Sequence, residues 1–510
     1  MSTANRVIKN TGYLYAKMGV TVFISLYTTR LILNALGVSD FGVYNVVGGA
    51  ISMLGFLHAA MSTTTQRFMS FYEGRGDKEM QKYIFNVSNV LHYGIAFVLV
   101  ILLLLAGVVF FNGVLNIPED RIFAAKVIYG SLILSTVFTV VSVPYEAVLN
   151  AHENMLYYSI VGIIESLLKL AVAVMIVYYV GDKLVLYGIL MVLVPFISRV
   201  IMQVYCRRKY EECVIAPRTY FEKSLMKEMT SFAGWSFLVT SSGMVTQYGM
   251  GLVLNNFFGA VLNAAQGVAN QISGQLMVFS NNMFKAVNPV IVKSEGGGNR
   301  TKMLEISMVS AKFSIYMLAF FAIPFIIETE YLLKLWLKNI PDFAIIFVRL
   351  QLLRFVIEQF TFSIGKVIEA EGRIKKYSVI TSVLNIFPII LTYVFFEMGY
   401  PPYFLYISWI LMWGIVRGAV ILWFSKFNCG MSYRAYFNKV LLPGITICLA
   451  MILFGYLPLY CMDSSLVRLF LVGVTTSLTF IVMISLVFVT PSEKEIFTKL
   501  LRKISFFRKT

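Results

Sequence analysis

Long apolar runs recur along this chain and constrain its fold more than any other feature. The run at residues 96–110 reads AFVLVILLLLAGVVF, and about 20 mostly apolar residues are enough for a helix to cross the hydrocarbon core of a bilayer. Hydrophobic residues make up 58% of the sequence and charged residues only 14%, whereas a soluble chain carries about 25% charged residues. The sequence therefore predicts a polytopic membrane protein.

The predicted spans are helices, so the fold class is all-α. Strands of a membrane barrel alternate polar and apolar residues over about 10 positions, and the runs here are continuous and longer. No cleavable leader is expected, because the opening MSTANRVIKNTG leads into a span without a small-residue cleavage site. We expect fourteen spans, at 11–35, 42–64, 86–111, 127–149, 157–179, 184–205, 231–254, 262–284, 305–327, 344–366, 377–396, 402–424, 440–460 and 467–489.

Basic residues gather on one side of these spans. An even number of spans puts both termini on the same side, and its ends and loops hold about five times as many Lys and Arg residues as the opposite loops. Both termini are therefore predicted to be cytoplasmic. The formal net charge of +17 then largely faces anionic lipid head groups, and no nucleic-acid partner is needed to explain it.

Two polar interruptions of the chain correspond to each other. Residues 63–78 read TTTQRFMSFYEGRGDK, and residues 285–300 read KAVNPVIVKSEGGGNR. A shift of 222 residues aligns the two breaks without a gap, and a shift of 219 aligns a second pair of cytoplasmic turns, 148–159 with 367–378. The first shift superposes Gly37 on Gly259, Glu73 on Glu295, Gly74 on Gly296 and Gly76 on Gly298.

This repeat predicts the domain organisation. We expect a six-helix half at 1–222, a second six-helix half at 223–426, and two further spans with a basic cytoplasmic tail at 427–510. Because six is even, the halves have the same orientation and are related by an axis along the membrane normal. Two such halves that rock about a central site are a common transporter architecture.

The chain also resembles a known family. The residues that carry the resemblance are GVSDFGVYNVVGG (37–49) and the turns AHENMLYYS (151–159) and AEGRIKKYS (370–378), together with the 6+6+2 pattern of spans. They are similar to the O-antigen-type polysaccharide-exporting flippases of the multidrug/oligosaccharidyl-lipid/polysaccharide (MOP) exporter superfamily. The resemblance covers essentially the whole chain and implies a MATE-like, V-shaped bundle with a central cavity.

The resemblance also implies a function. Its substrate would be an undecaprenyl-pyrophosphate-linked oligosaccharide, the repeat unit of an O-antigen, capsule or exopolysaccharide. The flippase would move it by alternating access from the cytoplasmic to the periplasmic leaflet of the bacterial inner membrane. Besides this lipid-linked oligosaccharide and the bilayer, the polysaccharide polymerase and the chain-length machinery are the partners that such a role implies.

Charged residues inside the spans give independent support, because charges at that depth are costly and usually functional. The cations are Lys17, Arg30, Lys169, Arg199, Lys312, Arg349, Arg354 and Arg417. The acids are Glu146, Glu165 and Glu358. Two pairs at i,i+4 spacing, Glu165 with Lys169 and Arg354 with Glu358, are placed to neutralise each other. A positively lined cavity suits an anionic pyrophosphate, which a guanidinium can hold with two hydrogen bonds.

The charges inside the spans and the repeat together indicate candidate site residues. The candidate substrate-binding cations are Arg30, Lys17, Arg354, Arg417 and Lys312. The eighth span adds a polar stripe with Gln266 and Asn270, and the repeat places Tyr44 on the corresponding face of the second span. Amides and aromatic rings suit sugars, although inter-helix hydrogen bonding explains the stripe as well. For Lys17 and Lys312, snorkelling to the cytoplasmic surface is the alternative role.

Three further residues are candidates near the cytoplasmic surface. Arg67 and Lys285 lie at nearly equivalent ends of the second and eighth spans, where they would receive the head group or simply follow the positive-inside bias. Glu146 is the candidate site for H⁺ or Na⁺ coupling. It lies close to the cytoplasmic edge, where solvent exposure is an equally good explanation.

Competing functions remain at this point. A MATE-type multidrug exporter is expected to bind cations with acids in its cavity, the opposite of the balance here. A flippase for peptidoglycan lipid precursors has the same helix count and a cationic cavity as well. An enzyme is disfavoured because no Asp pair, phosphate-binding loop or nucleophile motif is present. The inward charges also disfavour a scaffold protein. No cofactor or bound metal is expected from the scattered cysteines and histidines.

Overall fold

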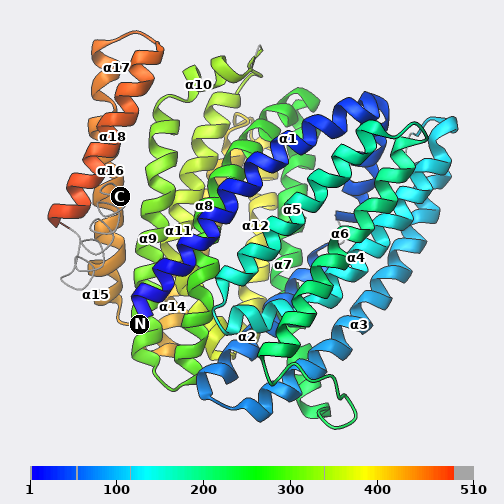
Figure 1. Ribbon diagram of the computed structural model, residues 1–510. Coiled ribbons are helices and arrows are strands. Elements are labelled where there is room, and N and C mark those ends of the chain that lie inside the picture. The colour runs from blue at the N-terminus through cyan, green and yellow to red at the C-terminus, as the bar shows by residue number, and fades with distance from the viewer. Residues whose placement is uncertain (1–2, 53–54, 115–116, 338, 488–510) are drawn as a thin grey trace, which may run out of the picture. The chain divides into compact units, whose positions relative to one another are not determined.

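The computed structural model describes residues 3–52, 55–114, 117–337 and 339–487. All secondary structure in these ranges is helical (Figure 1). Each predicted span coincides with helical residues except at Tyr179, positions 402–403 and Tyr456, which lie outside the helices. Positions 53–54 and 488–489 of the predicted spans lie outside the described residues. The all-α fold class is thereby confirmed.

Contacts divide the chain into two compact units, which are described separately. The N-terminal unit comprises residues 10–240 together with 292–299, which are the end of α8 (Ala260–Gly296) and the turn that follows it. Its helices are α1 (Thr3–Ser52), α2 (Gly55–Arg75), α3 (Lys78–Val109), η1 (Phe110–Val114), η2 (Glu119–Arg121), α4 (Ile122–Ala151), α5 (Met155–Tyr178), α6 (Lys183–Lys209) and the first half of α7 (Lys223–Phe258).

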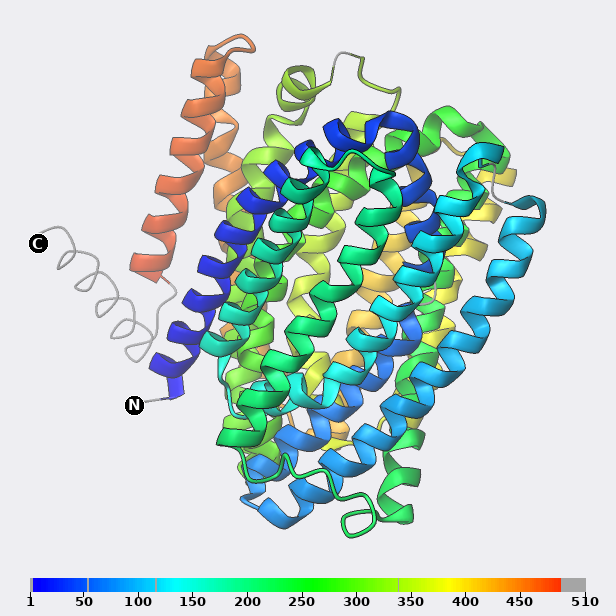
Figure 2. The ribbon, with the colours of Figure 1, turned by 45° about the vertical axis from the view of Figure 1, so that its right-hand side comes forward.

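The C-terminal unit holds the rest of the described chain, including residues 3–9, 241–291 and 300–487. Its helices are α8 (Ala260–Gly296), α9 (Arg300–Ile327), α10 (Thr329–Trp336), α11 (Ala344–Glu371), α12 (Lys375–Glu397), α13 (Phe404–Trp409), η3 (Ile410–Val416), α14 (Arg417–Cys429), α15 (Tyr433–Tyr436), η4 (Phe437–Leu441), α16 (Leu442–Gly455), α17 (Leu457–Cys461) and α18 (Leu466–Val487). Figures 1 and 2 show α16 and α18 side by side.

Eleven helical segments of the described residues are long and apolar enough to cross a membrane. The described residues of α1 after Gly37, together with α2, α8 and α11, fall outside this group. Each of these helices overlaps one of the fourteen predicted spans. Helix α11 carries Arg349, Arg354 and Glu358 in its span, and α8 carries amides such as Gln266 and Asn270, so both place polar groups at depths where lipid alone could not satisfy them.

The backbone supports the repeat. Gly37 and Gly259, which the 222-residue shift superposes, have φ values of 77° and 79°, and both mark breaks between helices. Gly76 and Gly298, superposed by the same shift, have φ values of 75° and 73°. These left-handed conformations favour glycine, so the matched glycines reflect matched turns rather than shared hydrophobic composition.

Each unit has an apolar core, and apolar side chains also cover the outside. In the N-terminal unit, Leu103 of α3 packs with Ile128 of α4 and Leu184 of α6. In the C-terminal unit, a cluster that includes Ile315 of α9 and Ile447 of α16 packs α16 and α18 against α9, α11 and α14. Large apolar side chains remain exposed on many helices, as expected for surfaces in contact with lipid.

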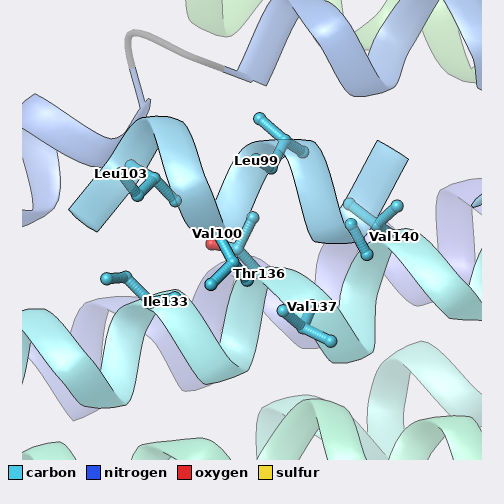
Figure 3. Close-up of a pocket in the computed structure, with 8 residues that line it drawn as sticks. Leu99, Val100, Leu103, Ile133, Thr136, Val137 and Val140 are labelled. Atoms are coloured by element: carbon cyan, nitrogen blue, oxygen red, sulfur yellow. The ribbon is translucent and has the colours of Figure 1, made fainter. Parts of the chain in front are cut away.

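A shallow hollow lies between α3 and α4 (Figure 3). Its lining is aliphatic apart from Thr136, whose hydroxyl donates to the carbonyl of Leu132 at 2.8 Å. The lining residues are Ala96, Leu99, Val100, Leu103, Ile133, Thr136, Val137 and Val140. The hollow therefore offers no polar group for a sugar or a phosphate, and we treat it as a packing feature.

Candidate functional site

Arg354 is the most deeply buried of the candidate cations. It lies in α11 with only 1% of its surface exposed. Its guanidinium carbon is 4.1 Å from the ring centroid of Trp409 and 5.6 Å from that of Trp413. Aromatic faces attract a desolvated guanidinium, and such contacts contribute about 2 kcal/mol or more. The aromatic residues of α13 and η3 thus hold this positive charge inside the C-terminal unit.

The carboxylate of Glu358 does not fully satisfy Arg354. Its Oε1 lies 3.6 Å from Arg354 Nε, which is beyond hydrogen-bonding distance. Within the described part of the chain, Nε and Nη1 of Arg354 have no hydrogen-bond acceptor. Burial makes such unpaired donors costly. This guanidinium therefore retains the capacity to bind an additional acceptor.

Arg417 lies close to the same aromatic group. Its guanidinium carbon is 4.8 Å from the Trp413 ring, and its Nη1 donates to Asn385 Oδ1 at 3.1 Å. Arg417 follows the π-helical segment η3, a distortion that is frequent at functional sites. The structure thus brings Arg354 and Arg417 together around Trp413, as expected if both belong to one anion-binding site.

Asn385 connects this group to α7. Its amide donates to the hydroxyl of Ser242 at 3.0 Å, and its backbone carbonyl accepts hydrogen bonds from Thr246 and from the Trp413 indole. These bonds join α7, α12 and η3 within the C-terminal unit. The orientation of Arg417 is therefore fixed through Asn385 by side chains from two other helices.

The polar stripe of α8 bonds partly to α11. Gln351 Nε2 donates to Asn270 Oδ1 at 3.2 Å. About two to three turns further along both helices, the hydroxyl of Ser280 donates to Gln359 Oε1 at 2.7 Å. Gln266 is buried, and its Oε1 lies near Gly251. These contacts favour inter-helix bonding for at least Asn270.

Lys312 lies apart from the Trp413 group, on α9. It is buried, with its ammonium 5.9 Å from the ring centroid of Phe313. Arg349 is another cation of a predicted span, and its Nε donates to the carbonyl of Ile326 at 3.1 Å. Helix α11 therefore carries two arginines with different surroundings. Arg349 bonds to a backbone carbonyl, whereas Arg354 contacts mainly aromatic rings.

In the N-terminal unit the candidates lie at separate places along α1. Lys17 Nζ lies 4.4 Å from the ring centroid of Tyr158, and its stem packs where a side chain at Gly162 would lie. Glu146 is close enough to this tyrosine for its charge to act on it. Arg30 is exposed and thirteen residues further on, which is about 20 Å along a helix. Arg30 and Lys17 therefore do not form one compact site.

Tyr44 and the entrance candidates have different surroundings. Tyr44 contacts Tyr187 edge-to-face with ring centroids 5.0 Å apart. Arg67 is largely buried, with its guanidinium carbon 4.7 Å from the ring of Phe68, 4.9 Å from that of Phe71 and 5.4 Å from that of Phe232. Lys285 is half-buried on α8. The aromatic surroundings of Arg67 resemble those of Arg354 more than those of a solvated surface charge.

A charged cluster at the helix ends of the N-terminal unit was not predicted. His152 Nδ1 lies 3.2 Å from Glu73, and its Nε2 lies 2.5 Å from Glu212. Lys293 Nζ lies 3.0 Å from Glu153 and 3.8 Å from Glu73. All five residues lie outside the predicted spans. We call them the His152 cluster.

In the His152 cluster, the carboxylates and the imidazole stabilise each other's charged forms. Burial alone would raise the pKa of Glu73, yet hydrogen bonds from His152 and Lys78 lower it from 4.5 to about 2. Burial likewise opposes ionisation of Glu212, but its hydrogen bond to His152 lowers its pKa. For His152, burial acts to lower the pKa, whereas hydrogen bonds to Glu212 and Glu73 outweigh it and raise the pKa above 6.5. Both carboxylates thus stabilise the imidazolium.

Two signals in the sequence could have pointed to this cluster. Glu73 belongs to the loop that the repeat conserves, and His152 and Glu153 belong to the second aligned turn. The two shifts align Glu73, His152 and Glu153 with residues about 220 positions further along the chain. They do not relate these three residues to one another. Among the described residues, no group of three or more His, Cys, Asp or Glu side chains is arranged to hold a metal ion.

Comparisons with known proteins agree with these observations. Residues 7–295 match a family described as polysaccharide biosynthesis protein. A stretch of 122 residues is 30% identical to an uncharacterized membrane protein, EpsK, of Bacillus subtilis (strain 168). That stretch spans 23% of this chain and 24% of EpsK, about a quarter of the relative's length.

Solved transporter structures share the fold. A structure of MATE in the bent conformation has a TM-score of 0.71 at 16% identity and covers 82% of this chain and 94% of its own. A MOP superfamily transporter from Pyrococcus furiosus has a TM-score of 0.70 at 14% identity, with coverages of 83% and 95%. At this level of identity the likeness concerns the fold alone.

Proposed function

Because the chain belongs to a family described as polysaccharide biosynthesis protein and shares its fold with MATE and MOP superfamily transporters, we propose that it flips an undecaprenyl-pyrophosphate-linked oligosaccharide. It is a multi-pass membrane protein, and the proposed location is the bacterial inner membrane with both termini in the cytoplasm. The excess of Lys and Arg in the loops on that side supports this orientation. The proposed substrate is the repeat unit of an O-antigen, capsule or exopolysaccharide.

The observation that carries the proposal is the pair Arg354 and Arg417 around Trp413. Two guanidinium groups lie within contact distance of one indole ring, and in the described part of the chain the acid within ion-pair distance of either of them is Glu358, beside Arg354. Each guanidinium keeps at least one buried N–H without an acceptor in the described part of the chain. A pyrophosphate supplies several acceptor oxygens and two or more negative charges, which would satisfy these donors.

The remaining candidates extend this proposal. Arg30 and Lys17 would contact the anionic head group at other points along its path, and Tyr44 and Gln266 would face sugar rings. Transport would follow from alternating access of the two six-helix halves, 1–222 and 223–426, around the substrate. No covalent step and no cofactor is required. A polysaccharide polymerase and the chain-length machinery would act on the product at the outer face.

A multidrug exporter is the second candidate, because the MATE transporter structures share this fold. Such a protein would bind cationic drugs, for which the group around Arg354 and Arg417 is electrostatically unsuitable. A flippase for peptidoglycan lipid precursors remains compatible with the charges, because its substrate is also a lipid-linked pyrophosphate.

The experiment that separates these functions locates the lipid-linked oligosaccharide in cells lacking this gene. The proposal expects the intermediate to accumulate on the cytoplasmic leaflet while surface polymer disappears, and a plasmid copy should restore both. Accumulation of a peptidoglycan precursor instead would identify the other flippase. If repeat units still reach the periplasm and only drug tolerance falls, the protein is a multidrug exporter.

A further inference from the structure

The end of α8 and the turn that follows it pack against the other residues of the N-terminal unit, to which they belong. Residues 292–299 group with residues 10–240 rather than with the rest of α8. Lys293 of this segment bonds to Glu153, whose side chain is fully buried, and lies 3.8 Å from Glu73. Docking of the segment therefore depends on a lysine whose carboxylate partners come from the ends of α2 and α4.

One oxygen of Glu73 lies between two cations. Its Oε1 is the atom that faces both His152 Nδ1, at 3.2 Å, and Lys293 Nζ, at 3.8 Å. Its other oxygen, Oε2, accepts from Lys78 at 2.9 Å and from Gln81 at 3.0 Å. His152 and Lys293 consequently compete for the same negative charge.

The remaining surroundings of His152 are defined as well. From the segment after α6, Glu212 bonds to its Nε2, and Tyr210 stacks on its ring with centroids 4.2 Å apart. Glu153 is its neighbour in the chain and bonds to Lys293. The charged groups described around His152 include three carboxylates (Glu73, Glu153 and Glu212), two lysines (Lys78 and Lys293) and the imidazole.

We propose that His152 is a proton-binding site that controls docking of residues 292–299. With a neutral imidazole, the negative charges of Glu73 and Glu153 attract Lys293. A proton on His152 offsets the charge of Glu73 and repels Lys293 as a like charge. Protonation therefore weakens docking, and docking in turn favours loss of the proton, as linkage requires.

The geometry sets the direction of the pH dependence. Hydrogen bonds to two carboxylates place the pKa of His152 above 6.5, despite its burial. The imidazole is thus charged below that pKa and neutral above it, so docking strengthens as the pH rises through it. The side chain keeps 15% of its surface exposed, which leaves a route for protons.

This inference rests on the proposed function, because it takes the release of residues 292–299 from the end of α2 as one step of alternating access. It assigns the proton as the ion that regulates this step. The site differs from Glu146, which the sequence suggested for coupling: Glu146 lies on α4 in a predicted span, whereas His152 lies at the end of that helix.

Hydrogen–deuterium exchange of the full chain in lipid nanodiscs tests the proposed pH-dependent docking of residues 292–299. Protection of amides 292–299, corrected for intrinsic exchange, would be measured from about pH 5.5 to about pH 8.5. We expect protection to rise about five- to tenfold across the titration of His152. His152→Gln should remain protected at every pH, and Lys293→Ala should remain unprotected. Lys82→Ala removes a lysine whose ion pair, with Glu79, lies outside the cluster, and this variant should keep its pH-dependent docking.

Two results would overturn the inference. One is protection that stays constant or falls as the pH rises in the wild-type chain. The other is wild-type protection in Lys293→Ala. Neither result depends on a substitution at His152, so the test holds even if His152→Gln fails to fold. The measurement contains no substrate, so its failure leaves the flippase proposal intact, and a failed leaflet assay would leave pH-dependent docking in place.

Discussion

Gly74 and Gly296, which the 222-residue shift superposes, each lie against the backbone of the other's helix. A Cβ added at Gly74 would lie 2.1 Å from the carbonyl oxygen of Lys293, and one added at Gly296 would lie 1.9 Å from that of Phe71. Phe71 and Lys293 are themselves related by the same shift. The contact between the ends of α2 and α8 is therefore reciprocal, and both of its closest approaches require glycine.

Gly74→Ala and Gly296→Ala should each force these two ends apart. Both new methyl groups would meet backbone atoms, which cannot move aside as a flexible side chain could. We expect a loss of about 1–3 kcal/mol of stability and faster amide exchange in residues 292–299. Thermal unfolding and exchange measurements would check this.

Gly94→Ala is the matched control for these two changes. Gly94 also lies in a helix, but nothing lies within 4 Å of an added Cβ. This change should leave the exchange of residues 292–299 unaltered. If Gly74→Ala behaves in the same way as Gly94→Ala, the close contact between α2 and the end of α8 is not required for docking.

The helices and the repeat could be predicted because local sequence encodes them. Continuous apolar runs specify spans by length alone, and left-handed glycines such as Gly76 and Gly298 keep their positions in both halves. The i,i+4 pair of Glu165 and Lys169 forms as its spacing predicts, at 2.7 Å.

The candidate site could be predicted only in part, because its partners come from distant segments. Arg354 has the same spacing to Glu358 that Glu165 has to Lys169, yet the distance is 3.6 Å, because Trp409 attracts the guanidinium to a ring 55 residues further along the chain. Likewise, His152 and Glu212 are 60 residues apart. No periodicity in the sequence relates such pairs.

Glu358→Gln should destabilise the protein by leaving Arg354 without its acid. Removing one partner of a buried ion pair costs about 3–5 kcal/mol, and the long 3.6 Å separation favours the lower end of this range. Lys334→Ala, which breaks an exposed pair with Glu330, should cost less than about 1 kcal/mol. Chemical unfolding in detergent would compare the two variants.

A double variant separates the role of Arg354 in folding from its role in transport. Arg354→Met with Glu358→Leu removes both charges and should recover most of the lost stability. If Arg354 contacts the pyrophosphate, export should still fail in this stable protein. Normal export by the double variant would show that Arg354 serves the fold and not the substrate.

Glu328 should hold α18 against the second half. Its two carboxylate oxygens accept from Arg468 Nε and Nη2 at 2.8 Å each, and Glu328 is fully buried. Glu328→Gln should cost about 3 kcal/mol and speed proteolysis at the turn before α18. Glu330→Gln, which affects an exposed pair with Lys334, is the control and should leave proteolysis unchanged. Equal proteolysis of the two variants would argue against this role of the ion pair.

Arg30 is a candidate for contact with the substrate that does not belong to the group around Trp413, and Arg30→Ala tests this role directly. Arg30 is exposed on α1, and within the described part of the chain no ion pair involves it. Its loss should therefore cost little stability. If it binds the pyrophosphate, losing a charge-assisted hydrogen bond of about 1.5–3 kcal/mol would reduce export by about ten- to a hundredfold, enough to abolish surface polysaccharide at normal protein levels.

Arg30→Lys and Arg199→Ala give this test its specificity. Lysine keeps the charge but loses the bidentate geometry, so Arg30→Lys should retain part of the export. Arg199 also lies in a predicted span, but it donates to the hydroxyl of Tyr93 at 2.9 Å, and its removal should leave export unchanged. Surface polysaccharide and membrane protein level would be measured together in each strain. Unchanged export with Arg30→Ala would remove Arg30 from the substrate path, because its exposure leaves no structural role to mask the effect.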